Sequence, residues 1–399
     1  MATIGAPCAR RPISSVVEAL PSSGIRAIFD EVTALEARGQ KVIRFDIGRP
    51  DFETPPFVVE AAQQALVRGQ TKYTGNRGIP QLLEAIHDKL LADQGVSYNP
   101  ATEIIVTAGA SEAVAAVMFG ILEPGAEVLI PEPAWPHYEQ CARLAGGTPV
   151  SVPVDVVQGR QLSVGDLERK VTSHTRLLVL NSPNNPTGQV LARETLVEVL
   201  EFAHEHGLYV LSDEIYEPFC YDEPHVSFAS LPGAREITIF VHSFSKAYGM
   251  TGWRLGYLAA PARLVSQLNK PHQYLTVCAN SFAQWGAVQA YRHPQSPTFL
   301  AQIAADFKRR RDTLLEIASE VPAMRFPAPQ GAFYFFPALA DGRLSSSAAA
   351  LKLLKEAGVA TVPGSVFGSA FDRHLRISYG SCSLEDLREG LQRIANVLY

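Results

Sequence analysis

The sequence predicts an α/β fold, with a large domain built on a mainly parallel seven-stranded sheet covered by helices and a smaller α+β domain. Three observations lead to this prediction. From Glu103, short β-branched runs alternate with longer amphipathic patterns, which is typical of a parallel sheet covered on both faces. One connection, around residue 246, is too short for a parallel crossover. At 399 residues, the chain is also long enough for more than one hydrophobic core.

The N-terminal part begins with an arm, residues 1 to about 24, that is rich in Ala, Ser, Pro and Arg. A strand is expected over 41–47, and a loop around Tyr73 separates two of the helices that follow the arm. Apolar residues at helical spacing predict these helices over 25–39, 56–69 and 81–95.

Seven apolar, β-branched runs account for the large sheet. They are expected as strands over 103–109, 126–133, 148–154, 175–183, 208–214, 237–244 and 253–261. Amphipathic helices are predicted between some of them, over 111–125 and 192–207. Only about ten residues join the last two strands, whereas a parallel crossover needs roughly a dozen or more. The last strand is therefore predicted to be antiparallel, with Lys246 on the turn before it.

The C-terminal part is predicted to mix helices and strands. Helices are expected within 262–291 and over 299–321, 346–358 and 384–399, and strands over 331–339, 360–368 and 374–380. The basic run 308–311 is most simply a solvated helix face. The domain division that follows is 1–47 for the arm and part of the small domain, 48–295 for the large domain, and 296–399 for the rest of the small domain.

Composition limits the possible partners. Hydrophobic residues make up 47% of the chain and charged residues 19%, and no apolar run approaches the ~20 residues that span a bilayer. The net charge of -5 argues against binding to nucleic acid. Five scattered cysteines without a C-x-x-C pair, and ten histidines without a ligand pattern, predict neither disulfides nor a metal site. We expect a cytoplasmic protein whose partners are small molecules or another protein chain.

Polar residues that could carry chemistry follow several of the predicted strands, where ligands of open α/β sheets bind. Lys246 lies in SFSKAYGMTGWRLGY, close to serines, glycines and Arg254. A primary amine beside hydroxyls and a guanidinium could bind a phosphorylated carbonyl compound through a Schiff base. Asp213 ends another strand, and Ser111 opens a helix whose first N–H groups could bind phosphate.

Four motifs in register, NSPNNPTG, SDEIY, SFSKAYGMTGWRLGY and LRISYG, resemble those of the fold-type I pyridoxal-phosphate aminotransferases of class I/II. The resemblance covers the chain from about Ile25 onward and implies an aspartate-aminotransferase-like fold. It also implies an enzyme that moves an amino group between an L-amino acid and a 2-oxo acid by a ping-pong mechanism, with pyridoxal 5'-phosphate as cofactor.

The resemblance assigns roles to individual residues. Lys246 would bind the cofactor as a Schiff base and move a proton, and Asp213 would hold the proton on the pyridine nitrogen. Asn185 and Tyr216 would donate hydrogen bonds to the ring's phenolic oxygen. The phosphate would be bound by Gly109, Ala110, Ser111, Ser243 and Arg254, and by Tyr73 from the neighbouring subunit of a homodimer. The ring of Trp135 would lie on the pyridine face of the cofactor. The substrate would contact Trp135, Asn185, Gly48 and Arg376, with Arg376 binding its α-carboxylate.

The sequence departs from its aspartate-preferring relatives at two positions. Ser111 stands where they have a lysine, and Gly24 where a hydroxyl residue is common. We therefore expect that acidic amino acids are not the preferred donors. A lyase, an oxidase or a cyclising synthase could use the same cofactor and residues. A regulator that uses this fold to bind an effector is a further alternative, but the segment before Ile25 is short for a DNA-binding module.

Overall fold

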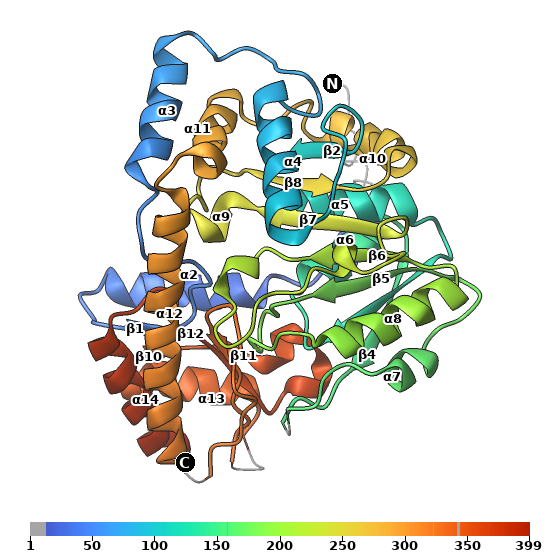
Figure 1. Cartoon of the computed structure of the whole chain (residues 1–399). Coiled ribbons are helices and arrows are strands. Elements are labelled where there is room, and N and C mark those ends of the chain that lie inside the picture. Colours follow the sequence, from blue (N-terminus) through green and yellow to red (C-terminus); the bar gives the residue numbers. More distant parts are fainter. Residues whose placement is uncertain (1–12, 158, 322, 341–343) are drawn as a thin grey trace, which may run out of the picture.

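The computed structural model describes residues 13–157, 159–321, 323–340 and 344–399. Its centre is a seven-stranded sheet with the strand order β2-β8-β7-β6-β5-β3-β4 (Figure 1). β8 runs antiparallel to both neighbours, and all the other pairs are parallel. The predicted sheet and its single antiparallel strand are therefore confirmed. The strands are β2 (Ile104–Thr107), β3 (Glu127–Glu132), β4 (Thr148–Pro153), β5 (Thr175–Asn181), β6 (Tyr209–Asp213), β7 (Thr238–Ser243) and β8 (Gly256–Ala259).

Helices cover both faces of this sheet because successive strand residues alternate between its two sides. Ile105, Val241 and Leu258 belong to one core with α5 and α10. Phe240 and Tyr257, next to them in sequence, belong to the core that includes α4 and α11. The helices around the sheet are α3 (Pro56–Val67), α4 (Pro80–Gln94), α5 (Ala110–Ile121), α6 (His137–Leu144), α7 (Val164–Glu168), α8 (Arg193–Glu205), α10 (Ala262–Leu275) and α11 (Ser281–Arg292).

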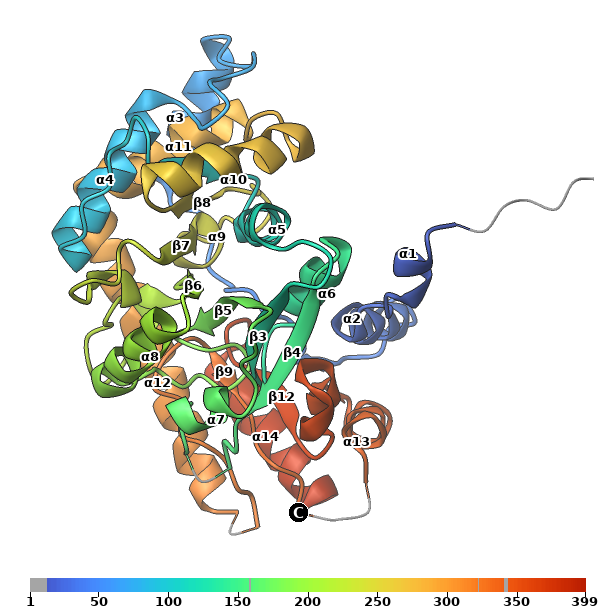
Figure 2. The same ribbon diagram turned by 90° about the vertical axis from the view of Figure 1, so that its right-hand side faces the viewer.

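The C-terminal part forms a separate layer below the large sheet, and the long helix α12 (Ser296–Ser319) runs alongside both (Figures 1 and 2). Near the N-terminus, β1 pairs in parallel with β10, so this early strand lies with the end of the chain. β9, β12 and β11 form a three-stranded antiparallel sheet. The elements are α1 (Ser15–Ala19), α2 (Gly24–Glu36), β1 (Ile43–Arg44), β9 (Tyr334–Phe335), α13 (Ser346–Lys352), β10 (Val359–Ala360), β11 (Val362–Pro363), β12 (Leu375–Ser378) and α14 (Leu384–Leu398).

Several local predictions need correction. The strands expected over 331–339 and 360–368 are much shorter, and a 3-10 turn at Gly364–Phe367 follows β11. A Cβ at Gly364 would lie 2.3 Å from the carbonyl oxygen of Phe371, so the chain turns there against other backbone. The predicted arm includes the short helix α1, and its residues 1–12 lie outside the described part. Lys246 lies not on a bare turn but on a four-residue helix, α9 (Phe244–Ala247).

The basic run on α12 is not a uniformly solvated face. The guanidinium of Arg311 makes two hydrogen bonds to Asp222, at 2.7 and 2.8 Å, and that of Arg310 pairs with Asp51. Both arginine side chains are largely buried. In the described part of the chain, no helix has the length and apolar character needed to cross a membrane.

Candidate active site

A cavity of about 250 Å³ lies between the carboxyl ends of the central strands and the C-terminal layer. Eleven of the thirteen predicted site residues line it; only Gly109 and Tyr73 do not. Its walls are formed by Ile25, Gly48, Ala110, Ser111, Trp135, Tyr138, Asn181, Asn185, Asp213, Ile215, Tyr216, Ser243, Ser245, Lys246, Thr251, Arg254, Tyr334 and Arg376.

Lys246 is held in the cavity by the short helix α9, whose N-cap Ser243 accepts a hydrogen bond from the amide of Ser245 at 3.1 Å. The amine of Lys246 donates a hydrogen bond of 2.6 Å to the carbonyl oxygen of Gly48. Burial lowers its pKa to about 8, and the nearby positive charges of Arg376 and Arg254 act in the same direction. The arrangement therefore increases the fraction of the neutral amine, which is the form that acts as nucleophile and base.

Asp213 is fully buried at the end of β6. Its carboxylate accepts hydrogen bonds from the hydroxyl of Tyr138, at 2.6 Å, and from the amide of Ile215, at 3.3 Å. Burial raises the pKa of Asp213 to about 6, and the bond from Tyr138 opposes this rise. No ion pair to Asp213 occurs within the described ranges, so its charge can pair with a cationic ligand.

Two buried tyrosines form another wall of the cavity. The hydroxyl oxygens of Tyr216 and Tyr334 lie 2.7 Å apart, and their rings make an edge contact. Burial, together with Tyr334, raises the pKa of Tyr216 well above its usual value. Both side chains are therefore neutral hydroxyls at physiological pH and can donate hydrogen bonds to a ligand.

Arg376 is a cation buried in β12, with 2% of its surface exposed. Its guanidinium donates to the backbone oxygen of Asp46, at 2.8 Å, and to the side-chain oxygen of Asn185, at 3.3 Å. It lies over the ring of Tyr334, 4.9 Å from the centroid. Among the described residues, its Nε has no hydrogen-bond partner, and burial lowers the pKa of the guanidinium. Within the part that the structure describes, no carboxylate pairs with Arg376, so the group is suited to bind a carboxylate ligand.

The other end of the cavity gathers groups that bind anions. Helix α5 begins at Ala110, and the first N–H groups of a helix have no partner within it. Arg254 lies beside this helix end with a positive φ of 55°, a rare conformation for a residue with a side chain. A Cβ added at Gly109 would lie 2.7 Å from Nη2 of Arg254, so the close approach requires glycine. The hydroxyls of Ser243 and Ser245, 2.9 Å apart, complete this end.

Trp135 lines the cavity and stacks on His137, with 4.4 Å between the ring centroids. Tyr73 lies elsewhere on the single chain, with 86% of its surface exposed. Its loop reaches the segment just after α10 through a hydrogen bond from Asn76 to the backbone oxygen of Val277. Tyr73 therefore does not contact the cavity of its own chain.

Sequence reasoning missed several lining residues, above all Tyr138 and Tyr334. Tyr138 stands three residues after Trp135 at the start of α6, a helix that was not predicted. Tyr334 lies in the aromatic run GAFYFF, which resembles an ordinary buried strand. The only feature of the sequence that could have identified Tyr138 as a site residue was its proximity to Trp135. No local feature could have identified Tyr334.

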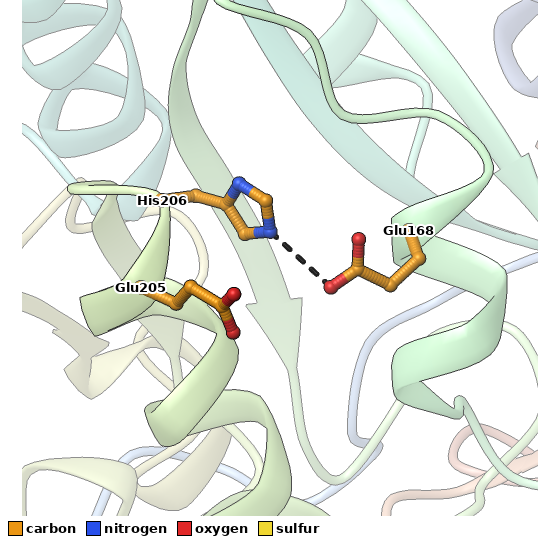
Figure 3. Close-up of side chains that lie close together, drawn as sticks. All are labelled: Glu168, Glu205 and His206. Atoms are coloured by element: carbon orange, nitrogen blue, oxygen red, sulfur yellow. Dashed lines mark hydrogen bonds and ion pairs between the residues drawn. The ribbon is translucent and has the colours of Figure 1, made fainter.

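A second cluster of polar side chains lies at the surface, on α7 and at the end of α8 (Figure 3). It consists of Glu168, Glu205 and His206, whose potential ligand atoms lie within 4.8 Å of one another. His206 Nε2 is 3.2 Å from a carboxylate oxygen of Glu168. All three residues are exposed and none lines the cavity. This group therefore takes no part in the candidate site. The sequence analysis had not indicated this cluster.

Known proteins resemble this chain over almost its whole length. The family described as aminotransferase class I and II matches residues 40–394. A probable aspartate/prephenate aminotransferase from Aquifex aeolicus is 43% identical, over 98% of this chain and 99% of that protein. Aromatic-amino-acid aminotransferase 2 from Thermococcus litoralis is 40% identical, over 97% and 98% of the two chains.

Solved structures agree with these sequence relatives. The aspartate aminotransferase from Thermus thermophilus with maleate superimposes with a TM-score of 0.92 at 37% identity, covering 98% of this chain and all of that one. The fold predicted by resemblance is therefore confirmed, and the chain belongs to the aminotransferase class I and II family.

Proposed function

We propose that this aminotransferase uses pyridoxal phosphate, held in the cavity around Lys246, to move an amino group between an L-amino acid and a 2-oxo acid by a ping-pong mechanism. One observation carries the proposal. The cavity combines an amine whose pKa is lowered to about 8 with two buried charged groups, a carboxylate that has no ion-pair partner and a guanidinium whose Nε has no hydrogen-bond partner among the described residues.

The residues present fit this cofactor. Asp213 offers a buried negative charge suited to a protonated ring nitrogen, and the neutral hydroxyl of Tyr216 suits a phenolic oxygen. The α5 N-terminus and Arg254 offer N–H groups and positive charge suited to a phosphate, at a point that only glycine at 109 leaves open. When bound, pyridoxal phosphate supplies an electron sink for the charge that develops on the substrate's Cα.

The chain's own residues handle the proton and the substrate. Near neutral pH, the lowered pKa of Lys246 leaves part of its population neutral, able to take a proton from Cα and return it. Asp213, with a pKa of about 6, is mostly ionised at pH 7 and can keep a proton on a ring nitrogen. Arg376 can bind the α-carboxylate in bidentate fashion, which orients Cα toward the amine of Lys246.

The lining supports donors beyond aspartate. Ser111 offers a hydroxyl where aspartate-preferring members have a lysine, and Ile25 adds an apolar side chain at the cavity wall. The similar proteins are themselves named for aspartate, prephenate and aromatic amino acids. We infer that acidic donors are not preferred and that aromatic or other apolar side chains are accepted.

We also propose a homodimer with shared sites, in which the exposed Tyr73 reaches the cofactor phosphate of the neighbouring subunit. The division into 1–47, 48–295 and 296–399 is proposed on the same footing, and the pairing of β1 with β10 supports it. The scattered cysteines are consistent with a cytoplasmic location.

The test compares Lys246→Ala with Lys270→Ala, a change at an exposed lysine outside the cavity. Lys246→Ala should bind pyridoxal phosphate without a borohydride-reducible covalent link and lose turnover by at least about 10³-fold, the range of a lost general base. Lys270→Ala should behave as the wild type. A covalent link that survives in Lys246→Ala would refute the assignment.

The reaction outcome is checked with the wild-type protein and an amino acid alone. An aminotransferase should convert one equivalent to the oxo acid and stop in the pyridoxamine form. Continued release of ammonia would indicate a lyase or an oxidase. A panel of donors tests specificity, and a marked preference for aspartate would contradict the inference from Ser111.

A further inference from the structure

Two segments that contribute to the carboxylate end of the cavity run side by side. The segment 45–51 provides the carbonyl oxygen of Asp46 to Arg376 and that of Gly48 to Lys246. The segment 375–381 begins with β12, which carries Arg376. The amide of Ser378 donates to the oxygen of Phe45 at 2.8 Å, so the two segments are joined near the start of 45–51.

At the other end, the two segments meet around Arg310 of α12. Its guanidinium makes two bonds to the carboxylate of Asp51, at 2.9 and 3.2 Å. It also donates to the carbonyl oxygens of Tyr379, at 3.3 Å, and Gly380, at 3.4 Å. The amide of Asp51 donates to the same Gly380 oxygen at 2.9 Å. One side chain from a third element thus connects both segments just beyond the carboxylate-binding residues.

These contacts of Arg310 with the two segments, called the clamp from here on, leave little room for alternative packing. The Arg310 side chain is 12% exposed, and a Cβ at Gly380 would lie 2.9 Å from the carbonyl oxygen of Arg49. The Asp51 side chain is 37% exposed, but the bidentate contact and the low exposure of Arg310 fix the geometry of the pair more firmly than in a loose surface pair. Asp306, one turn earlier on α12, also pairs with Arg310 at 2.8 Å. The arginine therefore keeps one carboxylate partner if Asp51 loses its charge.

We propose that Arg310, through its bidentate pair with Asp51, is a positioning residue that sets the spacing between Gly48 and Arg376 and so determines the affinity for α-carboxylate substrates. This inference rests on the proposed function, which makes Arg376 the carboxylate ligand. Changes at the clamp should alter substrate affinity but not cofactor affinity, because neither Arg310 nor Asp51 lines the cavity.

The neighbouring arginine supplies a matched control. Arg311 makes an equally close bidentate pair with Asp222, and it donates to the oxygen of Pro329 at 3.1 Å. This second pair joins segments that do not carry Gly48 or Arg376. Asp51→Asn and Asp222→Asn thus each remove one charge from a pair on the same helix, and only the first touches the clamp.

The experiment measures 3-phenylpropionate binding by calorimetry to protein saturated with pyridoxal phosphate, together with KM and kcat. We expect Asp51→Asn to raise the Kd for 3-phenylpropionate, and KM for both amino acid and oxo acid, about tenfold, a loss like that of a charge-assisted hydrogen bond. Its kcat should stay within about twofold, and its cofactor affinity should match that of the wild type. Asp222→Asn should leave Kd and KM unchanged.

A second variant guards against a simple loss of folding. Arg310→Lys keeps the charge, but a single ammonium cannot make the bidentate pair with Asp51 together with bonds to both carbonyl oxygens, so it should also raise Kd. An unchanged Kd in Asp51→Asn, an equal rise in Asp222→Asn, or a fall in kcat alone would each overturn the proposal. If the wild type shows no transamination, the proposed function fails, while the calorimetric Kd still tests the clamp.

Discussion

At the scale of single residues, the chemistry of the site depends on how burial and hydrogen bonds compete at Asp213. Burial alone disfavours the carboxylate and raises its pKa, to about 6, while the hydrogen bond from Tyr138 favours the charged form. The sequence pattern predicted Asp213 but not Tyr138, because a strand end is visible in the sequence, whereas a bonded partner 75 residues away in the chain is not.

Tyr138→Phe should shift this balance. Loss of the 2.6 Å bond removes an effect that lowers the pKa of Asp213, so that pKa should rise above 6, by roughly one unit for a hydrogen bond to a charged group. As the pH is lowered, the affinity for pyridoxal phosphate should therefore begin to fall at a higher pH in Tyr138→Phe than in the wild type. The measurement is the pH dependence of pyridoxal phosphate binding, with Tyr209→Phe as control because that hydroxyl contacts Arg263 instead. An unchanged midpoint would contradict the role given to Tyr138.

At the scale of elements, the start of α5 and the loop before β8 depend on each other. Gly109, the N-cap of α5, has a φ of 82°, and Arg254 approaches it more closely than a Cβ would allow. Helix α12 is a second example, since its arginines hold loops from distant parts of the chain. In both cases one element positions groups that another element carries.

Comparing Gly109→Ala with Gly125→Ala should separate the loss of stability caused by backbone strain from the loss of cofactor affinity. Gly125 also has a positive φ, of 90°, but an added Cβ would meet nothing within 4 Å. Each variant should lose about 1–3 kcal/mol of stability from its backbone conformation. Only Gly109→Ala should also displace Arg254 and weaken pyridoxal phosphate binding, by about tenfold or more, for the loss of a charged contact. Thermal unfolding and cofactor titration check both effects, and equal cofactor affinity in the two variants would refute the argument.

At the scale of the whole molecule, the cavity gathers residues from Ile25 to Arg376, so almost the entire chain takes part in one site. The exposed Tyr73 stands apart from it. Other large apolar side chains are also highly exposed on the chain, among them Val67 and Tyr274, each at 88%. The proposed homodimer rests on this position of Tyr73, outside the cavity of its own chain.

Sedimentation should therefore give the mass of two chains. Tyr73→Phe should raise the Kd for pyridoxal phosphate about tenfold through loss of one hydrogen bond to a charged phosphate. Tyr274→Phe, equally exposed, is the control and should leave this Kd unchanged. A monomer with full activity, or a Tyr73→Phe variant with unchanged Kd, would exclude the shared site.

The sequence by itself determined the sheet, its antiparallel strand and most of the helices, because strand and helix periods and the length of a connection are local properties. Its motifs also identified Lys246, Asp213 and Arg376 as candidate site residues. Only the tertiary structure decided that Tyr138 bonds to Asp213 and that Arg310 clamps Asp51. These contacts join residues far apart in the chain, and a buried charge selects its partner by proximity in the folded state. No local pattern records that proximity.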